Sequence, residues 1–236
     1  MENLLDCVEI EHGSDKTAAP SYSVIWMHGL GADANDFVPV IPELRLPEDR
    51  RIRFVFPNAP VRPVTINNQM PMRAWYDIMA LSSVSRDVDE PGLRASQTAI
   101  EALIRRENER GVPTERIILA GFSQGCAMAY QTGLRSSARL AGLICLSGYL
   151  PMADKTMNEH NKAHLDMPIF IGHGTYDPVV NFAFGEQTRD WLTAQGYTDV
   201  QWHTYPMAHS VNLDEINDIS AFLQSITTPA AARPGA

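Results

Sequence analysis

The sequence predicts an α/β fold, with a mostly parallel central sheet flanked by helices on both faces. Two observations lead to this prediction. Short apolar runs alternate along the chain with longer amphipathic segments, which is the order of repeated strand–helix–strand units. Most of these runs are nearly continuous in Val, Ile, Leu and Phe, as in parallel strands covered on both faces. In such sheets, function gathers in the loops beyond the carboxyl ends of the strands.

The predicted elements follow from this alternation. The expected strands are Tyr22–Met27, Arg53–Phe56, Ile117–Ala120, Gly142–Leu146, Pro168–Gly172 and Val200–Thr204. The expected helices are Ala34–Leu44, Leu93–Arg110, Gln124–Leu134, Phe182–Gln195 and Leu213–Ser225. The second helix has the strongest pattern, because Leu93, Ile100 and Leu103 share helical spacing. Pro91 lies near its start, where a missing N–H costs little.

One domain is predicted over residues 1–227. The chain has 236 residues, which suits a single large α/β domain, and it shows neither an internal repeat nor an interior linker. Residues 228–236, TPAAARPGA, are expected to form a disordered C-terminal tail, because small residues and prolines have little surface to bury.

Charge and cysteine content argue against several classes of protein. The formal net charge of -9 disfavours a nucleic-acid partner, because binding to phosphates depends on Lys and Arg. Cys7, Cys126 and Cys145 are odd in number and lack CxxC spacing, so neither a disulfide framework nor a zinc site is expected. No secretory signal is evident, and no stretch approaches the ~18 apolar residues of a membrane span. We therefore expect a cytoplasmic protein without membrane insertion.

Ser123 is the predicted nucleophile. The segment Gly121-Phe122-Ser123-Gln124-Gly125 lies between an expected strand and an expected helix. A serine on such a sharp turn is lifted above the edge of the sheet, and a side chain at either glycine position would collide with neighbouring backbone. The alternative is an ordinary turn with a capping serine. The position between strand and helix favours the nucleophile.

Two backbone amides are predicted to stabilise negative charge on a reacting carbonyl oxygen. One is the N–H of Gln124, directly after the serine, and the other is the N–H of Leu30 in the glycine-rich loop after an earlier strand. The alternative for that loop is a plain turn. His28, in the same loop, precedes the serine in the chain, whereas enzymes with this motif follow the order serine, acid, histidine. We therefore expect a structural role for His28.

Asp177 is the predicted acid, because it directly follows an apolar strand in the run PIFIGHGTYDPVV. The other aspartates considered are Asp154, Asp166, Asp190 and Asp199, which lie before that strand, within a helix or at the wrong end of the next strand. The alternative for Asp177 itself is a helix-capping aspartate.

His209 is the predicted base. It lies in the loop between the last expected strand and the last expected helix, whereas His203 lies within the strand. His173 lies close to Asp177 on the same loop and is expected to pack there or to contact a catalytic residue rather than to act as the base. His209 would take the proton of Ser123, with Asp177 orienting the imidazole, and an acyl-enzyme would form and be hydrolysed. The histidines lack HExxH spacing and no carboxylate cluster suggests a cation site, so no metal or cofactor is expected.

The segments HGLG, MRAWYDI, GFSQG, GTYDPVV and PMAHSV, in this order, resemble the carboxylesterase and acyl-protein thioesterase (lysophospholipase-like) family of α/β-hydrolases. The resemblance extends from about Tyr22 to Ser225. It implies the α/β-hydrolase fold, the same five site residues and no cofactor, and dimers are known in the family. The main prediction is a serine carboxylesterase acting on short- to medium-chain acyl esters. A protein S-acyl thioesterase or a lysophospholipase with the same triad is the alternative.

The segment VTINNQMPMRAWYDIMALSS is expected to shape the acyl pocket. Its apolar residues Met72, Trp75 and Leu81 are the predicted substrate-binding residues, since methionine adapts to irregular shapes and the corresponding loop of the family lies by the active site. The alternative is buried loop packing. Cys126 departs from the family, which commonly has a glycine there, and we expect no catalytic role for it.

Three other functions remain open from the sequence. Peptide or lactone hydrolysis would use the same machinery, although a propeller domain needs more chain and lactone enzymes of this size often use cysteine. A binding module on a hydrolase scaffold is a third reading, which the complete set of predicted catalytic residues disfavours.

Overall fold

The computed structural model describes residues 4–13, 20–79 and 88–227. The predicted disordered tail, residues 228–236, lies outside the described residues. Within them, no helix is long and apolar enough to cross a membrane.

Seven strands form one sheet in the order β1-β3-β2-β6-β7-β8-β9. They are β1 (Cys7–His12), β2 (Tyr22–Met27), β3 (Ile52–Pro57), β6 (Ile117–Phe122), β7 (Gly142–Leu146), β8 (Ile169–Gly174) and β9 (Val200–Tyr205). All neighbouring pairs are parallel except β1 and β3, which pair antiparallel at one edge. The mostly parallel sheet confirms the predicted fold class, and every predicted strand overlaps an observed one.

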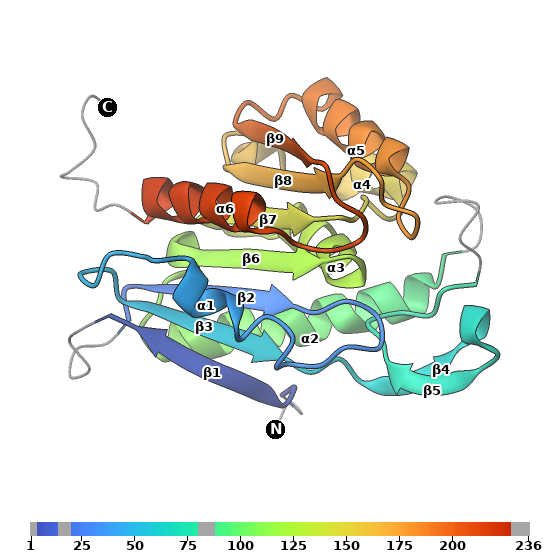
Figure 1. The fold of residues 1–236 in the computed structure, drawn as a ribbon, viewed down its shortest axis with the longest axis horizontal. Helices are drawn as coiled ribbons and strands as arrows, with labels where there is room; N and C mark the ends of the chain where they lie inside the picture. The colour runs from blue at the N-terminus through green and yellow to red at the C-terminus, as the bar shows by residue number, and fades with distance from the viewer. Residues whose placement is uncertain (1–3, 14–19, 80–87, 228–236) are drawn as a thin grey trace.

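Helices cover both faces of the sheet (Figure 1). They are α1 (Val40–Glu43), α2 (Glu90–Glu109), α3 (Gln124–Gly133), α4 (Ala153–Glu159), α5 (Phe182–Ala194) and α6 (Leu213–Ile226). One hydrophobic core joins the sheet to α2, α3 and α5, and a second joins it to α1 and α6. Strand β2 serves both, because Ile25 and Met27 belong to the first core while Val24 and Trp26 belong to the second. Burial on both faces explains the unbroken apolar run.

The predicted helix Ala34–Leu44 is wrong over most of its length. Only Val40–Glu43 is helical, and turns precede it. The side chain of Asp33 accepts a hydrogen bond from the backbone N–H of Asn35 at 2.8 Å, which favours a turn. Pro39 has no N–H to donate and restricts the residue before it, so a regular helix cannot run through this segment.

Four of the strands and α-helices in the described residues were not predicted. The edge strand β1 alternates apolar and acidic residues, which is a period-two signal different from the continuous runs of the buried strands. Strands β4 (Val61–Val64) and β5 (Met70–Arg73) form an antiparallel hairpin, and each contains a proline, which weakens a strand pattern. Helix α4 has only seven residues, too few for a helical period to stand out.

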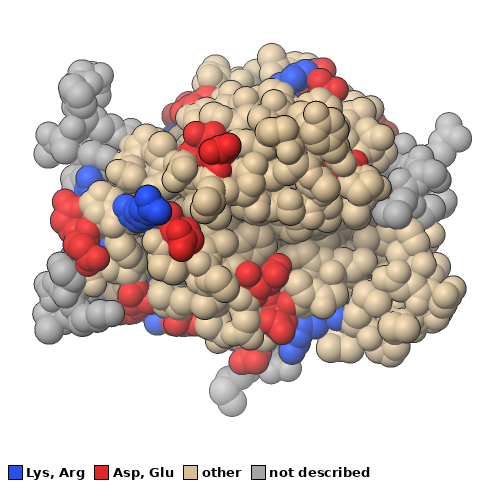
Figure 2. All heavy atoms as spheres, viewed as in Figure 1, with Lys and Arg blue, Asp and Glu red and all other residues tan. Residues whose placement is uncertain are grey.

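The hairpin of β4 and β5 lies beyond the sheet in Figure 1, on the side where β2 and β3 end. Its Val61 and Met70 side chains are more than half exposed. Figure 2 shows few charged groups over this part of the molecule. On the face drawn in Figure 2, the surface beside the hairpin is therefore largely uncharged.

Candidate active site

Ser123 lies on a strained turn between β6 and α3. Its backbone has φ 56° and ψ −116°, a region that non-glycine residues rarely adopt and that costs about 1–3 kcal/mol. A Cβ at Gly121 would lie 2.1 Å from the carbonyl oxygen of Gly125, and a Cβ at Gly125 would lie 2.2 Å from that of Met27. Both flanking positions therefore require glycine, as the spacing predicts.

Asp177 and His209 are in direct contact. Asp177 follows β8, His209 follows β9, and the Asp177 Oδ2 to His209 Nδ1 distance is 2.6 Å. The other carboxylate oxygen, Oδ1, accepts hydrogen bonds from the backbone N–H groups of Val179 at 2.8 Å and Val180 at 2.9 Å. Because Nδ1 of the neutral imidazole donates to the carboxylate, Nε2 is the nitrogen that can accept a proton.

The His209 ring packs against the residue that precedes the serine. The ring centroids of His209 and Phe122 are 4.7 Å apart, at an interplanar angle of 42°. The loops that hold the acid and the histidine end in well-capped helices. Asn181 caps α5 through the N–H of Ala183, and Asn212 caps α6 through the N–H of Glu215, both at 2.9 Å. Such caps typically contribute about 1 kcal/mol each.

His173, in β8, and His203, in β9, have different surroundings from His209. His173 is buried, and its Nε2 donates to the carbonyl of Val180 at 2.9 Å, which supports the loop of Asp177. Burial lowers the pKa of His173 and favours the neutral ring. His203 instead stacks on Phe170 at 4.7 Å and lies 3.4 Å from Asp218.

His28 has the structural role that the sequence predicts. Its Nε2 accepts a hydrogen bond from the N–H of Ala59 at 3.1 Å, so its Nδ1 carries the proton and donates to the carbonyl of Gly29 at 2.7 Å. Burial lowers the pKa of His28, which favours this neutral form. The ring thereby fixes the loop that carries Leu30.

A network of hydrogen bonds connects this loop to the residue after the serine. The indole Nε1 of Trp75 donates to the carbonyl of His28 at 2.9 Å. The backbone N–H of Trp75 donates to the side-chain oxygen of Gln124 at 2.8 Å, and Nε2 of Gln124 donates to the carbonyl of Tyr76 at 2.7 Å. The hydroxyl of Ser96 donates to the carbonyl of Trp75. The N–H, carbonyl and indole N–H of Trp75 and both polar atoms of the Gln124 side chain therefore each have a hydrogen-bond partner.

A pocket of about 230 Å³ opens beside the serine. It is lined by Leu30, Ile66, Asn67, Tyr76, Ile78, Ser123, Gln124, Tyr149, Val179 and Val180. Leu30 and Gln124, whose amides are the predicted donors, therefore lie on the same pocket as Ser123. Its other walls are mainly aliphatic and aromatic.

The three predicted substrate-binding residues are not in this lining. Trp75 is fully buried, its hydrogen bonds to Gln124 and His28 hold it in place, and it has no surface exposed to this pocket. Met72 is half-buried, and the side-chain amide of Asn67 donates to its sulfur at 3.2 Å. Leu81 lies outside the described residues.

The residues that do line the pocket had weak signals in the sequence. Ile66 and Ile78 lie in the segment that was expected to shape the pocket, and Val179 and Val180 follow Asp177 after one proline. Tyr149 follows β7 after two residues of loop, a position at the functional edge of the sheet that carries no motif.

Cys126 lies beneath the turn rather than in the pocket. It is buried, and a Cβ at Gly148 would lie 2.5 Å from its sulfur. Burial raises the pKa of the Cys126 thiol well above its usual range, which keeps it protonated and unreactive. The described part of the chain also contains no group of three or more His, Cys, Asp or Glu side chains that could hold a metal ion.

Comparison with known families identifies the family of this chain. The model of the phospholipase/carboxylesterase family matches residues 5–227. The chain belongs to this family. As a member of it, the protein is an α/β-hydrolase with hydrolase activity.

Named relatives of this family member cover almost its whole length. Acyl-protein thioesterase 1 of Yarrowia lipolytica is 38% identical over 210 residues, covering 88% of this chain and 92% of the relative. Acyl-protein thioesterase 1 of Neurospora crassa is 40% identical over 212 residues, covering 85% of each. The crystal structure of Arabidopsis thaliana SOBER1 has a TM-score of 0.81 at 26% identity, covering 88% of this chain and 99% of that one.

Proposed function

We propose that this family member is a serine hydrolase that cleaves acyl thioesters on proteins, with Ser123 as nucleophile, His209 as base and Asp177 as the orienting acid. The observation that carries the proposal is the 2.6 Å contact between Asp177 and His209 at the sheet edge that also holds the strained Ser123. The names of the relatives favour thioesters over the short- to medium-chain esters of the main sequence-based prediction.

The reaction would proceed in two acyl transfers. The hydroxyl oxygen of Ser123 attacks the thioester carbonyl while Nε2 of His209 takes its proton. The tetrahedral intermediate collapses, the carbon–sulfur bond breaks, and the sulfur leaves with that proton as a free thiol. Water, activated by His209, then hydrolyses the acyl-enzyme to a carboxylic acid and regenerates Ser123. Throughout, Asp177 stabilises the imidazolium and keeps the ring oriented.

The negative charge on the carbonyl oxygen would be held by the backbone N–H groups of Leu30 and Gln124. Loss of one such donor typically costs a factor of about 10²–10³ in kcat. Gln124 is also the first residue of α3, whose N-terminus favours nearby negative charge. The acyl chain would lie in the apolar pocket between Ile66, Ile78 and Val180.

Hydrolysis of oxygen esters is the second candidate function. Esters pass through the same tetrahedral intermediate, and the family description includes phospholipases and carboxylesterases. The catalytic groups alone cannot distinguish the two leaving groups, because an alkoxide and a thiolate both accept the same proton from His209.

The test compares two peptides that differ only in the acylated atom, one an S-acyl cysteine and the other an O-acyl serine. We expect kcat/KM to be higher for the thioester peptide, and Ser123→Ala to lower kcat for both by roughly 10⁴–10⁶-fold while the protein stays folded. A preference for the O-acyl peptide would favour the esterase. Near-normal activity of Ser123→Ala would refute the proposal, as would the failure of wild-type protein to react with a fluorophosphonate.

A further inference from the structure

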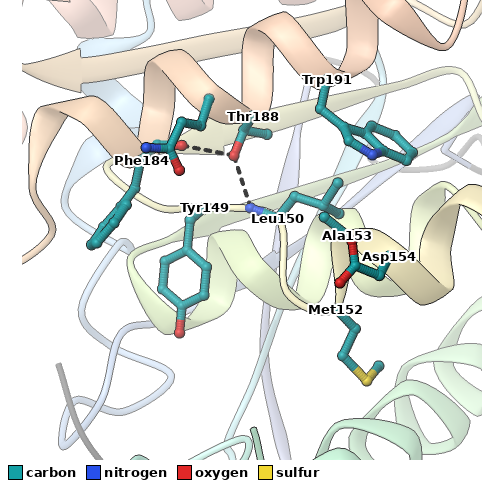
Figure 3. A pocket seen from close by; sticks show the side chains of 9 residues that line it. Tyr149, Leu150, Met152, Ala153, Asp154, Phe184, Thr188 and Trp191 are labelled. Atoms are coloured by element: carbon teal, nitrogen blue, oxygen red, sulfur yellow. Dashed lines mark hydrogen bonds between the residues drawn. The ribbon is translucent and has the colours of Figure 1, made fainter. Parts of the chain in front are cut away.

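A second cavity adjoins the pocket of Ser123. It has a volume of about 360 Å³ and lies between the segment after β7 and helix α5. Figure 3 shows Phe184, Thr188 and Trp191 extending from α5 towards Tyr149 and Leu150. The function proposed above makes no use of this cavity.

The interior of the second cavity suits an apolar occupant. Most of its wall consists of aromatic and aliphatic side chains. The hydroxyl of Thr188 is already satisfied, because it accepts from the N–H of Leu150 and donates to the carbonyl of Phe184, both at 2.9 Å (Figure 3). Of the other lining residues with polar atoms, Asp154 and Gln187 are exposed and therefore lie at the mouth. The indole N–H of Trp191 is buried and has no hydrogen-bond partner among the described residues.

Tyr149 is the wall that the two cavities share, since it lines both. Two contacts hold its ring. The ring packs edge-on against Phe184 with centroids 6.3 Å apart, and its hydroxyl lies 2.9 Å from that of Tyr76. Rotation of this one side chain away from Tyr76 would connect the pocket of Ser123 with the second cavity.

The volumes of the two cavities bear on the length of chain that can be bound. The pocket of Ser123, at about 230 Å³, is smaller than the roughly 300–1,000 Å³ of sites that bury a drug-sized ligand. Joined to the neighbouring 360 Å³, it falls well within that range. The free energy gained by burying a few more methylene groups exceeds the free energy lost when the neutral hydrogen bond between the hydroxyls of Tyr149 and Tyr76 breaks.

Building on the proposed function, we infer that the second cavity binds the distal end of a long acyl chain whose carbonyl carbon lies at Ser123. Tyr149 separates the two subsites and turns aside when the chain is long enough to reach it. Short chains end within the first pocket. Tyr149 is thus a determinant of chain length, and the cavity against α5 is the distal acyl subsite.

The test measures how fast butyl, octyl, dodecyl and hexadecyl fluorophosphonates label the full-length protein. Ala153→Phe introduces a ring into the second cavity from the start of α4. We expect the ratio of hexadecyl to butyl labelling rates to fall about tenfold, which corresponds to the loss of roughly two buried methylene groups. Tyr149→Phe removes the hydroxyl that bonds to Tyr76, and it should raise the same ratio about threefold, as expected for the loss of a weak hydrogen bond.

Asn158→Phe is the matched control, because Asn158 is exposed on the same helix and outside both cavities. It should leave the ratio unchanged. Thermal unfolding of each variant separates loss of fold from loss of binding, and Tyr149→Phe tests the subsite independently if Ala153→Phe does not fold.

Several results would overturn the inference. An unchanged ratio in Ala153→Phe and Tyr149→Phe, or an equal loss at every chain length, would show that the cavity does not hold the chain. If Ala153→Phe reacted normally with every fluorophosphonate but hydrolysed S-acylated peptides slowly, the cavity would bind the polypeptide part of the substrate and not the acyl chain. Labelling that persists in Ser123→Ala would refute the proposed function itself, and the subsite with it.

Discussion

Gln124 and Trp75 are joined by a 2.8 Å hydrogen bond, in which the backbone N–H of Trp75 donates to the side-chain oxygen of Gln124. Trp75 also holds the other half of the site, since its indole N–H donates to the carbonyl of His28. Trp75 therefore connects Gln124 with the loop of Leu30, the two positions whose backbone N–H groups are the candidate donors to the reacting carbonyl oxygen. The distance between those amides depends on Trp75, although Trp75 does not line the pocket.

Trp75→Phe removes the indole N–H and keeps a large ring. We expect kcat to fall about tenfold with KM nearly unchanged. The fall is smaller than the factor of about 10²–10³ for complete loss of one oxyanion donor, because the Leu30 N–H would be displaced and not removed. Steady-state kinetics on an S-acyl peptide measure this. Trp26→Phe is the control, because Trp26 is equally buried but its indole N–H has no partner among the described residues. The same loss of kcat in both variants would contradict the role given to Trp75.

Asp177→Asn tests the acid. An amide N–H facing His209 would favour the wrong tautomer of the imidazole, so kcat should fall by roughly 10³–10⁴-fold without loss of fold. Asp166→Asn is the control, since Asp166 was a rival in the sequence and pairs with Arg139 at the surface. Stopped-time assays of product acid compare the two. A loss of less than about tenfold in Asp177→Asn would argue against the triad.

Gly125→Ala tests the close packing behind the serine. The added Cβ would meet the carbonyl oxygens of Met27 at 2.2 Å and His28 at 2.7 Å, both of them backbone atoms. We expect the free energy of unfolding to fall by about 1–3 kcal/mol or more, with a loss of kcat as the turn shifts. At Gly29 the nearest atom to an added Cβ is 3.5 Å away, so Gly29→Ala should lower Tm much less. Equal changes in Tm would contradict the steric argument.

Glu215 makes the stability of the protein depend on pH. Burial, reinforced by the Asp218 carboxylate, raises the pKa of Glu215 to about 8, and both carboxyl oxygens lack a hydrogen-bond partner among the described residues. The folded state therefore keeps the proton up to about pH 8, whereas the unfolded chain releases it near its ordinary pKa of about 4.3. Between these values the folded state binds more protons, so this contribution to the free energy of unfolding decreases as pH rises.

Glu215→Gln should remove that dependence. Relative to wild type, the variant should gain stability as pH rises from about 5 to 9, by a few kcal/mol at most, since one pKa unit corresponds to about 1.4 kcal/mol. Urea unfolding at several pH values measures the difference. Parallel profiles for the two proteins would show that Glu215 is not the group responsible.

Much of the sheet could be predicted from the sequence. Strands β2 and β7 begin and end where the apolar runs predict, because burial on both faces leaves almost no polar residue within them. Strand β1 and the hairpin of β4 and β5 were missed for the opposite reason. They lie at edges, where partial exposure and proline hide the pattern that marks a central strand.

The candidate site, like the sheet, was predicted only in part from the sequence. Chain order and motif were enough to select Asp177 and His209, and the structure brings them into contact. The pocket was predicted less well. Trp75 was expected in its wall and lies behind it, while Tyr149, which has no motif, lines both cavities.

By itself, the sequence determined the parallel sheet, the glycine-flanked turn at Ser123 and the candidate acid and base, because each depends on residues adjacent in the chain or on strand order. Only the tertiary structure decided which side chains face the substrate pocket. That depends on packing between segments far apart in the chain, such as the contact of Tyr149 with Tyr76 and Phe184. No periodicity in the sequence specifies which side chains of distant segments contact one another. The pocket lining is therefore fixed only once the helices have packed against the sheet.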